Sequence, residues 1–531
     1  MSSEKLYLRQ NVLAEPLFNQ WYAWSYLISP ATAAMYVANL HLKIMESFVS
    51  APQAHVAALK NPAMLGGPFL NYGPDRVADV RVLMEKTLNE NSRLLELAAA
   101  IKSLDQTLFE VADGTSLEPF YQKVPDALKG YVELVYDLNQ QPSIRFIEGL
   151  LYKSPFFNDS SQSIALSLTD SDKRAFVFST PRLSRDDQLD LHVPFSSPAL
   201  DRLFRMKTNP GIPGEVMDML NVVSGSESLW QQLFTAEQPR QATPYLGEGV
   251  RIRYFGHACL LIEAGGISVL TDPVVSYECS TGIPRFTYAD LPERINYALI
   301  THNHQDHCMF ETLLQLRHKL QTVIVPKNNG SSLSDPSLKL VLKSMGFADV
   351  REIDEAETIE IEGGGITSLP FLGEHGDLNV RSKTAYYVNL RGRSIVCAAD
   401  SNNLEPLLYE RIKALVGQLD VIFIGMECDG APFSWLYGPL LTKPLSRKVD
   451  QSRRTDGSDY GKAIDIVDRL KPAEVYVYAM GQEPWLTYLT TVHYTEASRP
   501  IVDSNRLVED CRRRGLKSER LYGQKEIILD G

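Results

Sequence analysis

The sequence lacks several features that define whole classes of protein. No apolar run approaches the roughly 18–20 residues of a membrane-spanning helix, and the first ten residues, MSSEKLYLRQ, have no apolar core of the signal-peptide kind. Only six of the 531 residues are cysteines, at long and irregular spacings without a CxxC pair. This spacing argues against a disulfide framework and against a structural zinc ribbon. We therefore expect a cytoplasmic protein with reduced thiols and no membrane partner.

Positive charge is scarce relative to negative charge. The chain has 53 lysines and arginines against 65 aspartates and glutamates, which gives a formal net charge of −12. Because an acidic surface repels phosphate backbones, this balance argues against a nucleic-acid partner.

Histidine is also rare, and it is unevenly placed. The chain has 10 histidines, yet LITHNHQDHCMF (299–310) contains three of them and an aspartate within six positions. The cluster follows the apolar strand-like NYALIT and precedes a helix-like stretch, so one short loop could aim His302, His304, Asp306 and His307 into a common space. A polar turn that caps the helix is the alternative, but four such groups at one strand end favour a metal site. Histidine and carboxylate ligands suit Zn, Fe or Mn, and two pairs suit two metals about 3.5–4 Å apart.

The first half of the chain reads as helices with a small sheet. Apolar residues recur at three- and four-residue spacing through much of 1–110, which predicts helices, including a long stretch over 17–49. The segments SIALSLT (163–169) and RAFVFST (174–180) are alternating or β-branched enough to predict strands. The Pro-, Gly- and polar-rich stretch 235–250 predicts a linker.

The second half has a different pattern. Beyond residue 250, short apolar strands are first joined in hairpins and then alternate with helices, which predicts two packed sheets with helices outside. Because 531 residues exceed what one hydrophobic core usually supports, we expect two domains. The boundaries predicted are an α-rich accessory domain over 1–245 and a second domain over 246–531, in an α+β/α/β protein.

The histidine cluster and its flanks resemble the metallo-β-lactamase-fold superfamily. The shared features are HxHxDH, YFGHACLLIEAGGISVLTDP before it and CAAD after it, and the resemblance covers about 250–500. It implies a C-terminal αββα sandwich with a dinuclear site at the sheet edge, preceded here by a mixed, largely helical N-terminal domain. Most members of the superfamily are zinc hydrolases.

The family pattern also implies a set of metal ligands. It implies that His302 and His304 hold one metal and that Asp306 and His307 hold the other. Asp400 would bridge the two metals. Asp272 in LTDP would orient a ligand histidine from outside the first shell of ligands. The resemblance leaves His257 open between such a role and that of a satisfied core histidine.

Two departures separate this chain from the hydrolase pattern. Where the family has a third histidine for the first metal, FLGEHGDL offers Glu374 or His375. Where it has a last histidine after a late strand, AEVYVYAMGQEPW has Ala479-Met480-Gly481 instead. His493 is the only later histidine, and a surface or substrate-loop role is its alternative to metal binding. With Glu374 as ligand the set becomes oxygen-rich, which is typical of dinuclear iron sites that bind O₂.

These departures resemble a narrower group, the diiron oxygenases built on this fold, such as the β-hydroxylase of chloramphenicol biosynthesis. That group has a similar length, an additional N-terminal domain and a glutamate in place of the third histidine. The resemblance implies two non-haem iron ions, with Glu374 and Asp400 as the decisive carboxylates. It implies hydroxylation of the β-carbon of an amino acid tethered as a thioester to the phosphopantetheine of a nonribosomal peptide synthetase carrier domain.

The implied reaction uses O₂ as co-substrate. Electrons would come from an external donor, because the sequence has no flavin, nicotinamide or iron–sulfur signature. The alternative is a dizinc hydrolase of the same fold, acting on a phosphodiester, lactone or thioester, and a non-catalytic scaffold with a degenerate site comes third.

Substrate and partner contacts are hypotheses at this level. In ECDGAPFSWLYGPL (427–440), Glu427 or Asp429 could bind an α-amino group, and Trp435, or its neighbours Phe433 and Tyr437, could pack against an aromatic side chain. Packing of this loop against the N-terminal domain is the alternative.

Two basic stretches of the sequence are candidate docking surfaces for a carrier domain. An acidic carrier would need a local basic patch, for which 452–462 and 511–525 are candidates. The N-terminal domain could serve homodimerisation, carrier docking or cover of the active-site entrance.

Overall fold

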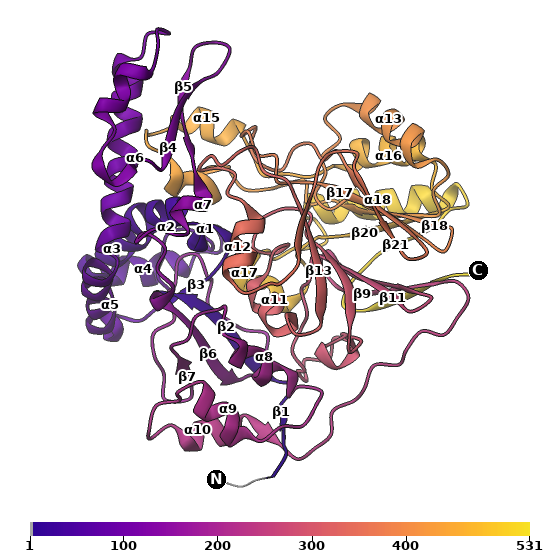
Figure 1. Cartoon of the computed structure of the whole chain (residues 1–531). Coiled ribbons are helices and arrows are strands. Elements are labelled where there is room, and N and C mark those ends of the chain that lie inside the picture. Colours follow the sequence, from indigo (N-terminus) through magenta and orange to yellow (C-terminus); the bar gives the residue numbers. More distant parts are fainter. Residues whose placement is uncertain (1–3, 531) are drawn as a thin grey trace.

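The computed structural model describes residues 4–530 (Figure 1), and its C-terminal half is built on two seven-stranded sheets. The first sheet contains, in spatial order, β14 (Val350–Ile353), β13 (Leu320–Pro326), β12 (Ile295–Leu299), β11 (Ile267–Thr271), β10 (Cys259–Ala264), β9 (Val250–Gly256) and β22 (Lys525–Leu529). The second contains β15 (Thr358–Ile361), β16 (Gly364–Leu369), β17 (Ala385–Leu390), β18 (Arg393–Cys397), β19 (Val421–Gly425), β20 (Glu474–Tyr478) and β21 (Lys517–Arg520).

Apolar side chains fill the space between these sheets. Ile252, Leu260, Val388, Phe423 and Tyr476 belong to one buried cluster contributed by both sheets. The outer face of the second sheet is covered by α13 (Pro406–Val416), α16 (Tyr460–Leu470) and α18 (Arg499–Arg513), which share a separate buried cluster with it. On the other side, α11 (Phe310–Leu316) and α12 (Leu338–Ser344) pack on the first sheet. The predicted αββα sandwich is confirmed.

Strand direction decides where side chains from different loops can meet. Strands β9, β10 and β11 are antiparallel neighbours, whereas β11, β12, β13 and β14 run parallel. In the second sheet β18, β19, β20 and β21 are also parallel. Because parallel strands end at the same edge, the segments that follow β11, β12, β18 and β20 can converge there.

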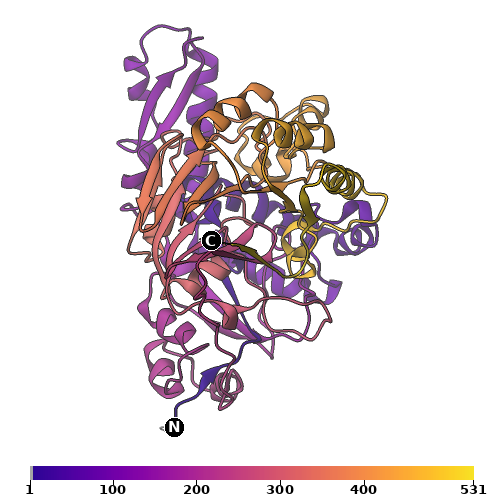
Figure 2. The same ribbon diagram turned by 90° about the vertical axis from the view of Figure 1, so that its right-hand side faces the viewer.

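The N-terminal half combines helices with a four-stranded sheet in the order β3–β2–β6–β7. Its strands are β2 (Val12–Phe18), β3 (Trp21–Tyr22), β6 (Gln162–Leu168) and β7 (Leu189–Leu191), and a separate pair joins β1 (Tyr7–Leu8) to β8 (Phe234–Thr235). Helices α5 (Val77–Glu90) and α6 (Ser92–Val111) are the longest of this half, and α6 rises with the hairpin β4 (Val132–Tyr136) and β5 (Pro142–Phe146) as an arm seen in Figure 1 and Figure 2.

Two local predictions are wrong. The helical stretch expected over 17–49 begins only at Ser25, because residues up to Tyr22 belong to β2 and β3. The strand expected over 174–180 is irregular, while the one expected over 163–169 exists as β6. In the irregular segment, Phe176 and Phe178 pack against Trp435 instead of pairing along a sheet.

The N-terminal half shares a core with the αββα sandwich. One buried cluster contains side chains of the N-terminal helices together with Leu313 of α11, Leu338 of α12 and Tyr437. Residues 236–249, which connect β8 to β9, form neither helix nor strand. None of the helices between residues 4 and 530 combines the length and apolar character needed to cross a membrane.

A buried ionic network also joins the halves. The Arg174 guanidinium lies 2.5 Å from Glu15 of β2 and 2.7 Å from Glu311 of α11, and Arg182 lies 2.9 Å from Glu15. All four side chains are almost entirely removed from solvent.

Candidate metal centre

The histidine cluster lies in the turn between β12 and α11. The backbone amides of His307 and Cys308 both donate to the carbonyl of His304, which closes a tight turn. His302, His304 and His307 are buried, and Asp306 is partly exposed. The turn therefore directs its four polar side chains inward, towards the edge where the parallel strands end.

Asp272, which follows β11, anchors this turn. Its carboxylate accepts the Thr301 amide at 2.7 Å and the Thr301 hydroxyl at 2.6 Å, and it faces His307 Nδ1 at 2.8 Å. His307 Nδ1–H donates to Asp272, and His307 Nε2 points at Asp400. Burial lowers the pKa of His307, but the two carboxylates outweigh it and raise this pKa well above its ordinary value, so Nε2 carries a proton until a cation replaces it. The Thr301 hydroxyl, having donated to Asp272, can accept from His302 Nδ1 at 3.0 Å, which leaves His302 Nε2 free.

His302, His304 and Glu374 form a first group of donor atoms. Their ligating atoms all lie within 4.8 Å of one another. His304 Nδ1 is 3.1 Å from His302 Nε2 and 3.4 Å from a Glu374 oxygen. His304 Nε2 lies 3.0 Å from the Tyr437 hydroxyl, so donation to that oxygen leaves the Nδ1 lone pair facing Glu374.

Glu374, and not the neighbouring His375, faces this group. Glu374 sits at φ 65°, a left-handed backbone conformation that is uncommon outside glycine. His375 stacks near His304 with ring centres 4.6 Å apart, and its Nε2 has no hydrogen-bond partner among residues 4–530. Between residues 4 and 530, the groups of three donor atoms within 4.8 Å do not include His375.

Asp400 connects the first group to a second. It follows β18, and one carboxylate oxygen lies 2.9 Å from His307 Nε2 and 3.8 Å from His302 Nε2. Its other oxygen is buried without a hydrogen-bond partner among the described residues. The geometry thus gives Asp400 a place between histidines of both pairs.

A third group contains Asp306, His307 and His257. His257 Nε2 lies 3.2 Å from His307 Nε2 and 3.4 Å from an Asp306 oxygen. The backbone amide of Ala479 donates to the His257 carbonyl, and that of Gly481 donates to His257 Nδ1 at 3.3 Å. His257 therefore lies beside the Ala479–Gly481 segment, where the hydrolase pattern has its last histidine.

The donor set fits two metal cations. Burial is the main reason why the pKa values of His302 and His304 are lowered, the latter to about 4, so these imidazoles are neutral and able to bind a cation. Burial, with Asp400 and Asp306 nearby, raises the pKa of Glu374 well above its usual range. Bound cations would offset this repulsion between carboxylates, and the unpaired Asp400 oxygen is a ready ligand.

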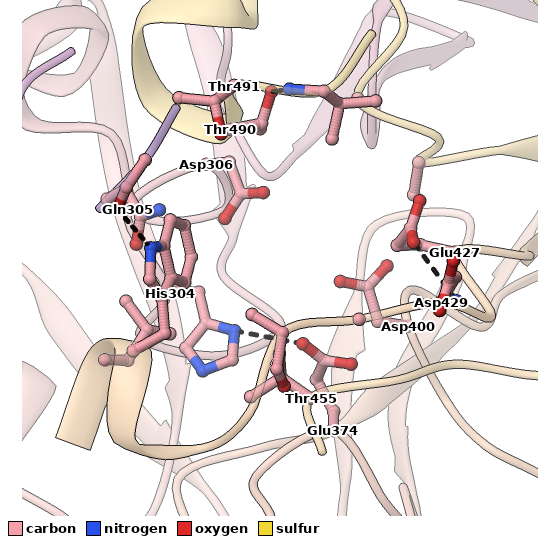
Figure 3. Close-up of a pocket in the computed structure, with 18 of the residues that line it drawn as sticks. His304, Gln305, Asp306, Glu374, Asp400, Glu427, Asp429, Thr455, Thr490 and Thr491 are labelled. Carbon is pink, nitrogen blue, oxygen red and sulfur yellow. Dashed lines mark hydrogen bonds and ion pairs between the residues drawn. The ribbon is translucent and has the colours of Figure 1, made fainter. Parts of the chain in front are cut away.

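A cavity of about 380 Å³ opens over these groups. Figure 3 shows the carboxylates of Asp306, Glu374, Asp400 and Glu427 directed into it from different loops. Burial, followed by the influence of Asp400 and Asp429, raises the pKa of Glu427 to about 8, and one Glu427 oxygen has no partner among residues 4–530.

Of the other residues that the sequence suggests as substrate contacts or metal ligands, some line the cavity and others do not. Trp435 lines the cavity, and its indole N–H donates to the Gly66 carbonyl at 2.9 Å. Asp429 lies exposed at the rim, and Phe433 is buried in the core shared with the N-terminal half. His493 lies at the surface and belongs to none of the three donor groups between residues 4 and 530.

Sequence reasoning missed several parts of the cavity wall. Leu65, Gly66 and Gly67 reach it from the N-terminal half, and residues 490–492 line it from the C-terminal half. No local motif marks these positions, because they meet the site only through the packing of distant segments.

Two family models match separate parts of the chain. The one described as the diiron non-heme beta-hydroxylase N-terminal domain matches residues 7–239, and the one described as a beta-lactamase superfamily domain matches residues 268–476.

Individual relatives match over different spans. The 4-amino-L-phenylalanyl-(CmlP-peptidyl-carrier-protein) 3-hydroxylase of Streptomyces venezuelae is 41% identical over 538 residues, covering 98% of this chain and 99% of that protein. The crystal structure of CmlA, a diiron beta-hydroxylase from Streptomyces venezuelae, matches with a TM-score of 0.93 at 39% identity, covering 99% of this chain and 100% of that one. A metal-dependent hydrolase of Pyrobaculum calidifontis is 40% identical over 250 residues, which is 44% of this chain and 98% of that protein.

Proposed function

The chain belongs to the diiron non-haem β-hydroxylase family, and from this membership we propose that it hydroxylates the β-carbon of an amino acid held as a thioester on a carrier domain. The relative from Streptomyces venezuelae is named for this reaction on a 4-amino-L-phenylalanyl carrier protein. The observation that supports it most directly is the position of Glu374, a carboxylate grouped with His302 and His304. The matching hydrolase covers 44% of this chain, whereas the hydroxylase match covers 98% of it.

The proposed reaction inserts one oxygen atom of O₂ into the Cβ–H bond and releases the other as water. Two electrons from an external donor and two protons balance it. Bound iron supplies the redox chemistry that activates O₂, which amino-acid side chains alone do not provide.

In this proposal the side chains of the protein hold and orient the two iron ions. His302, His304 and Glu374 would hold one iron ion, Asp306 and His307 the other, and Asp400 would bind both. Asp272 keeps His307 in one tautomer directly, and His302 through Thr301. Such supporting partners fix ring orientation and ligand basicity, and their loss commonly weakens metal binding about 10–100-fold.

Glu427 is the proposed anchor for the substrate amine. Its buried carboxylate faces the cavity with an oxygen that has no partner among residues 4–530. A substrate ammonium group there would supply a charge-assisted hydrogen bond. Trp435, in the same wall, offers a flat apolar surface for an aromatic side chain.

A cytoplasmic location remains part of this proposal. All six cysteines are free thiols in the structure, five of them buried, as expected for a protein kept in a reducing compartment.

The decisive experiment combines metal content with turnover. Protein produced with iron and zinc both present should contain about two iron ions per chain. It should also show ferric absorption that bleaches on reduction. After reduction it should add one oxygen atom to 4-amino-L-phenylalanine on a carrier domain, which mass spectrometry detects. Two zinc ions and a featureless spectrum would contradict the proposal.

A Glu374→Ala variant tests the ligand assignment. Removal of the carboxylate leaves two histidines in the first group, so iron content should fall and O₂-dependent hydroxylation should be lost. Glu360→Ala, an exposed glutamate on β15, is the matched control. Full iron content and turnover in Glu374→Ala would remove Glu374 from the ligand set.

A further inference from the structure

A short segment beside the cavity concentrates positive charge in an otherwise acidic chain. The residues from Lys443 to Arg454, KPLSRKVDQSRR, include five lysines and arginines and a single acid, although the whole chain has a net charge of −12. That acid, Asp450, is turned towards the protein and accepts the Ser434 amide. Lys443 lies 3.9 Å from Asp105, and Arg453 donates to the Gly376 carbonyl, so the free positive charge of the segment is that of Arg447 and Lys448.

Helix α15 (Arg447–Ser452) forms the exposed part of this segment. Arg447 and Lys448 are exposed, and neither has an acidic partner within 4 Å among residues 4–530. Leu445 and Val449 are 37% and 40% exposed on the same stretch. Free charge next to exposed apolar side chains is typical of an interaction surface.

The segment continues directly into the wall of the cavity. The Phe433 amide donates to the Arg453 carbonyl and the Thr455 amide to the Ala431 carbonyl, so residues 453–455 lie alongside the loop that bears Trp435. Arg454 lines the cavity and lies 3.9 Å from the exposed Asp429, a long ion pair that another anion could replace.

The other basic segment of the chain differs in this respect. Its cations are largely paired within the fold, namely Arg513 with Asp510, Arg514 with Asp468 and Asp510, Lys517 with Glu474, and Lys525 with Glu519. In Figure 1 its helix α18 and strand β21 lie on the right of the molecule, apart from α15 at the upper left. The cations of residues 511–525 are thus largely paired, and these residues lie away from the cavity mouth.

We propose that α15, with Leu445, Arg453 and Arg454, is the docking surface for an acidic carrier domain, and this rests on the proposed function. Carrier domains are acidic, and the phosphopantetheine arm has a phosphodiester at its base. An anionic partner would be attracted to this cationic segment of an otherwise acidic protein. Arg454 lies where the phosphate of an arm entering the cavity would pass.

Charge reversal tests the surface directly. The probe is a fluorescently labelled peptidyl-carrier domain loaded with 4-amino-L-phenylalanine, titrated with the full-length, iron-loaded protein. The double variant Arg447→Glu/Lys448→Glu should weaken binding by about tenfold or more and reduce its dependence on salt. The matched control, Arg513→Glu/Lys517→Glu, should stay within about twofold of the unmodified protein.

A second substrate separates docking from catalysis. The same amino acid as a thioester of free pantetheine has no carrier domain, so Arg447→Glu/Lys448→Glu should turn it over as the unmodified protein does. Unchanged carrier binding by that variant, or an equal loss in both double variants, would overturn the docking surface. If the unmodified protein hydroxylates neither substrate, the proposed function fails, whatever the binding data show.

Discussion

At the scale of single residues, a histidine near metal ligands can act through a lone pair or through an N–H. Its second nitrogen decides between these roles. His257 Nδ1 accepts the Gly481 amide, so a neutral ring has its proton on Nε2, which faces the Asp306 carboxylate at 3.4 Å. This geometry favours a role in which His257 positions Asp306 by donation over a role as metal ligand.

The substitution His257→Leu distinguishes the two roles. Loss of a donor beside Asp306 should leave about two iron ions per chain at saturating iron but weaken iron affinity about 10–100-fold. Iron titration, followed by the ferric absorption spectrum, measures both. His192→Leu, at an exposed histidine, should change neither. A drop to one iron per chain at saturation would instead make His257 a ligand.

The sequence indicates the candidate ligands that are close together in the chain. His302, His304, Asp306 and His307 share one turn, so their spacing alone predicts a metal site. Asp400 and Glu374 required the family pattern, because they come from other loops. The contact between His304 and Tyr437 spans 133 positions and leaves no local trace, so the sequence indicates only a substrate contact or packing on the N-terminal domain for Tyr437.

At the scale of elements, the Arg174 network links β2 to α11, the helix that follows the histidine turn. Two buried carboxylates share this one guanidinium. Replacement by an apolar residue leaves Glu311 without its cation and Glu15 with Arg182 alone. Removing one partner of a buried ion pair generally lowers stability far more than removing both partners, because the remaining charge stays buried without a partner.

We therefore expect Arg174→Met to lower the free energy of unfolding by about 3–5 kcal/mol. Urea denaturation measures this loss, and Arg174→Met/Glu311→Gln should recover part of it. The exposed pair between Arg185 and Asp187 is the control, and Arg185→Met should change stability by less than about 0.5 kcal/mol. If Arg174→Met and Arg185→Met lowered the free energy of unfolding by similar amounts, the buried network would have no special stabilising role.

Element types were harder to predict where local and tertiary signals differ. Every residue of β2 is buried, so its sequence lacks the alternation that identifies a half-buried strand. In the segment 174–180 the aromatic and β-branched residues suggested a strand, but Phe176 and Phe178 are used to pack against Trp435. Tertiary contacts override local preference at both places.

At the scale of the whole molecule, the junction of the two halves also encloses an amine. Lys207 Nζ lies 3.4 Å from the carbonyls of Gln10 and Val12 and above the ring of Tyr288 at 4.8 Å. Burial lowers the pKa of this amine to about 7 from its ordinary 10.5, with Glu311 and Glu278 opposing the shift.

This lowered pKa predicts a pH-dependent stability. Between pH 7 and 10.5 the unfolded chain holds a proton on Lys207 that the folded chain has lost, so the free energy of unfolding rises with pH there. Below pH 7 both states are protonated, and the full penalty for burying the charge applies. Relative to the unmodified protein, Lys207→Met should lose stability as the pH rises through this window, by up to about 1.4 kcal/mol per pH unit.

Denaturation curves of both proteins at several pH values measure this difference. Lys173→Met, at an exposed lysine near the same junction, should show a difference that does not vary with pH. A constant difference for Lys207→Met would show that the amine is charged in the folded protein throughout.

The hydrogen bond from Trp435 to Gly66 joins positions 369 residues apart in the wall of one cavity. In evolutionary terms, the part of the wall formed by residues 65–67 can vary independently of the loops that bear the candidate metal ligands. Substitutions at 65–67 can change what the cavity admits while selection keeps the histidine turn unaltered. Relatives with different substrates should therefore diverge at these positions before they diverge at the metal.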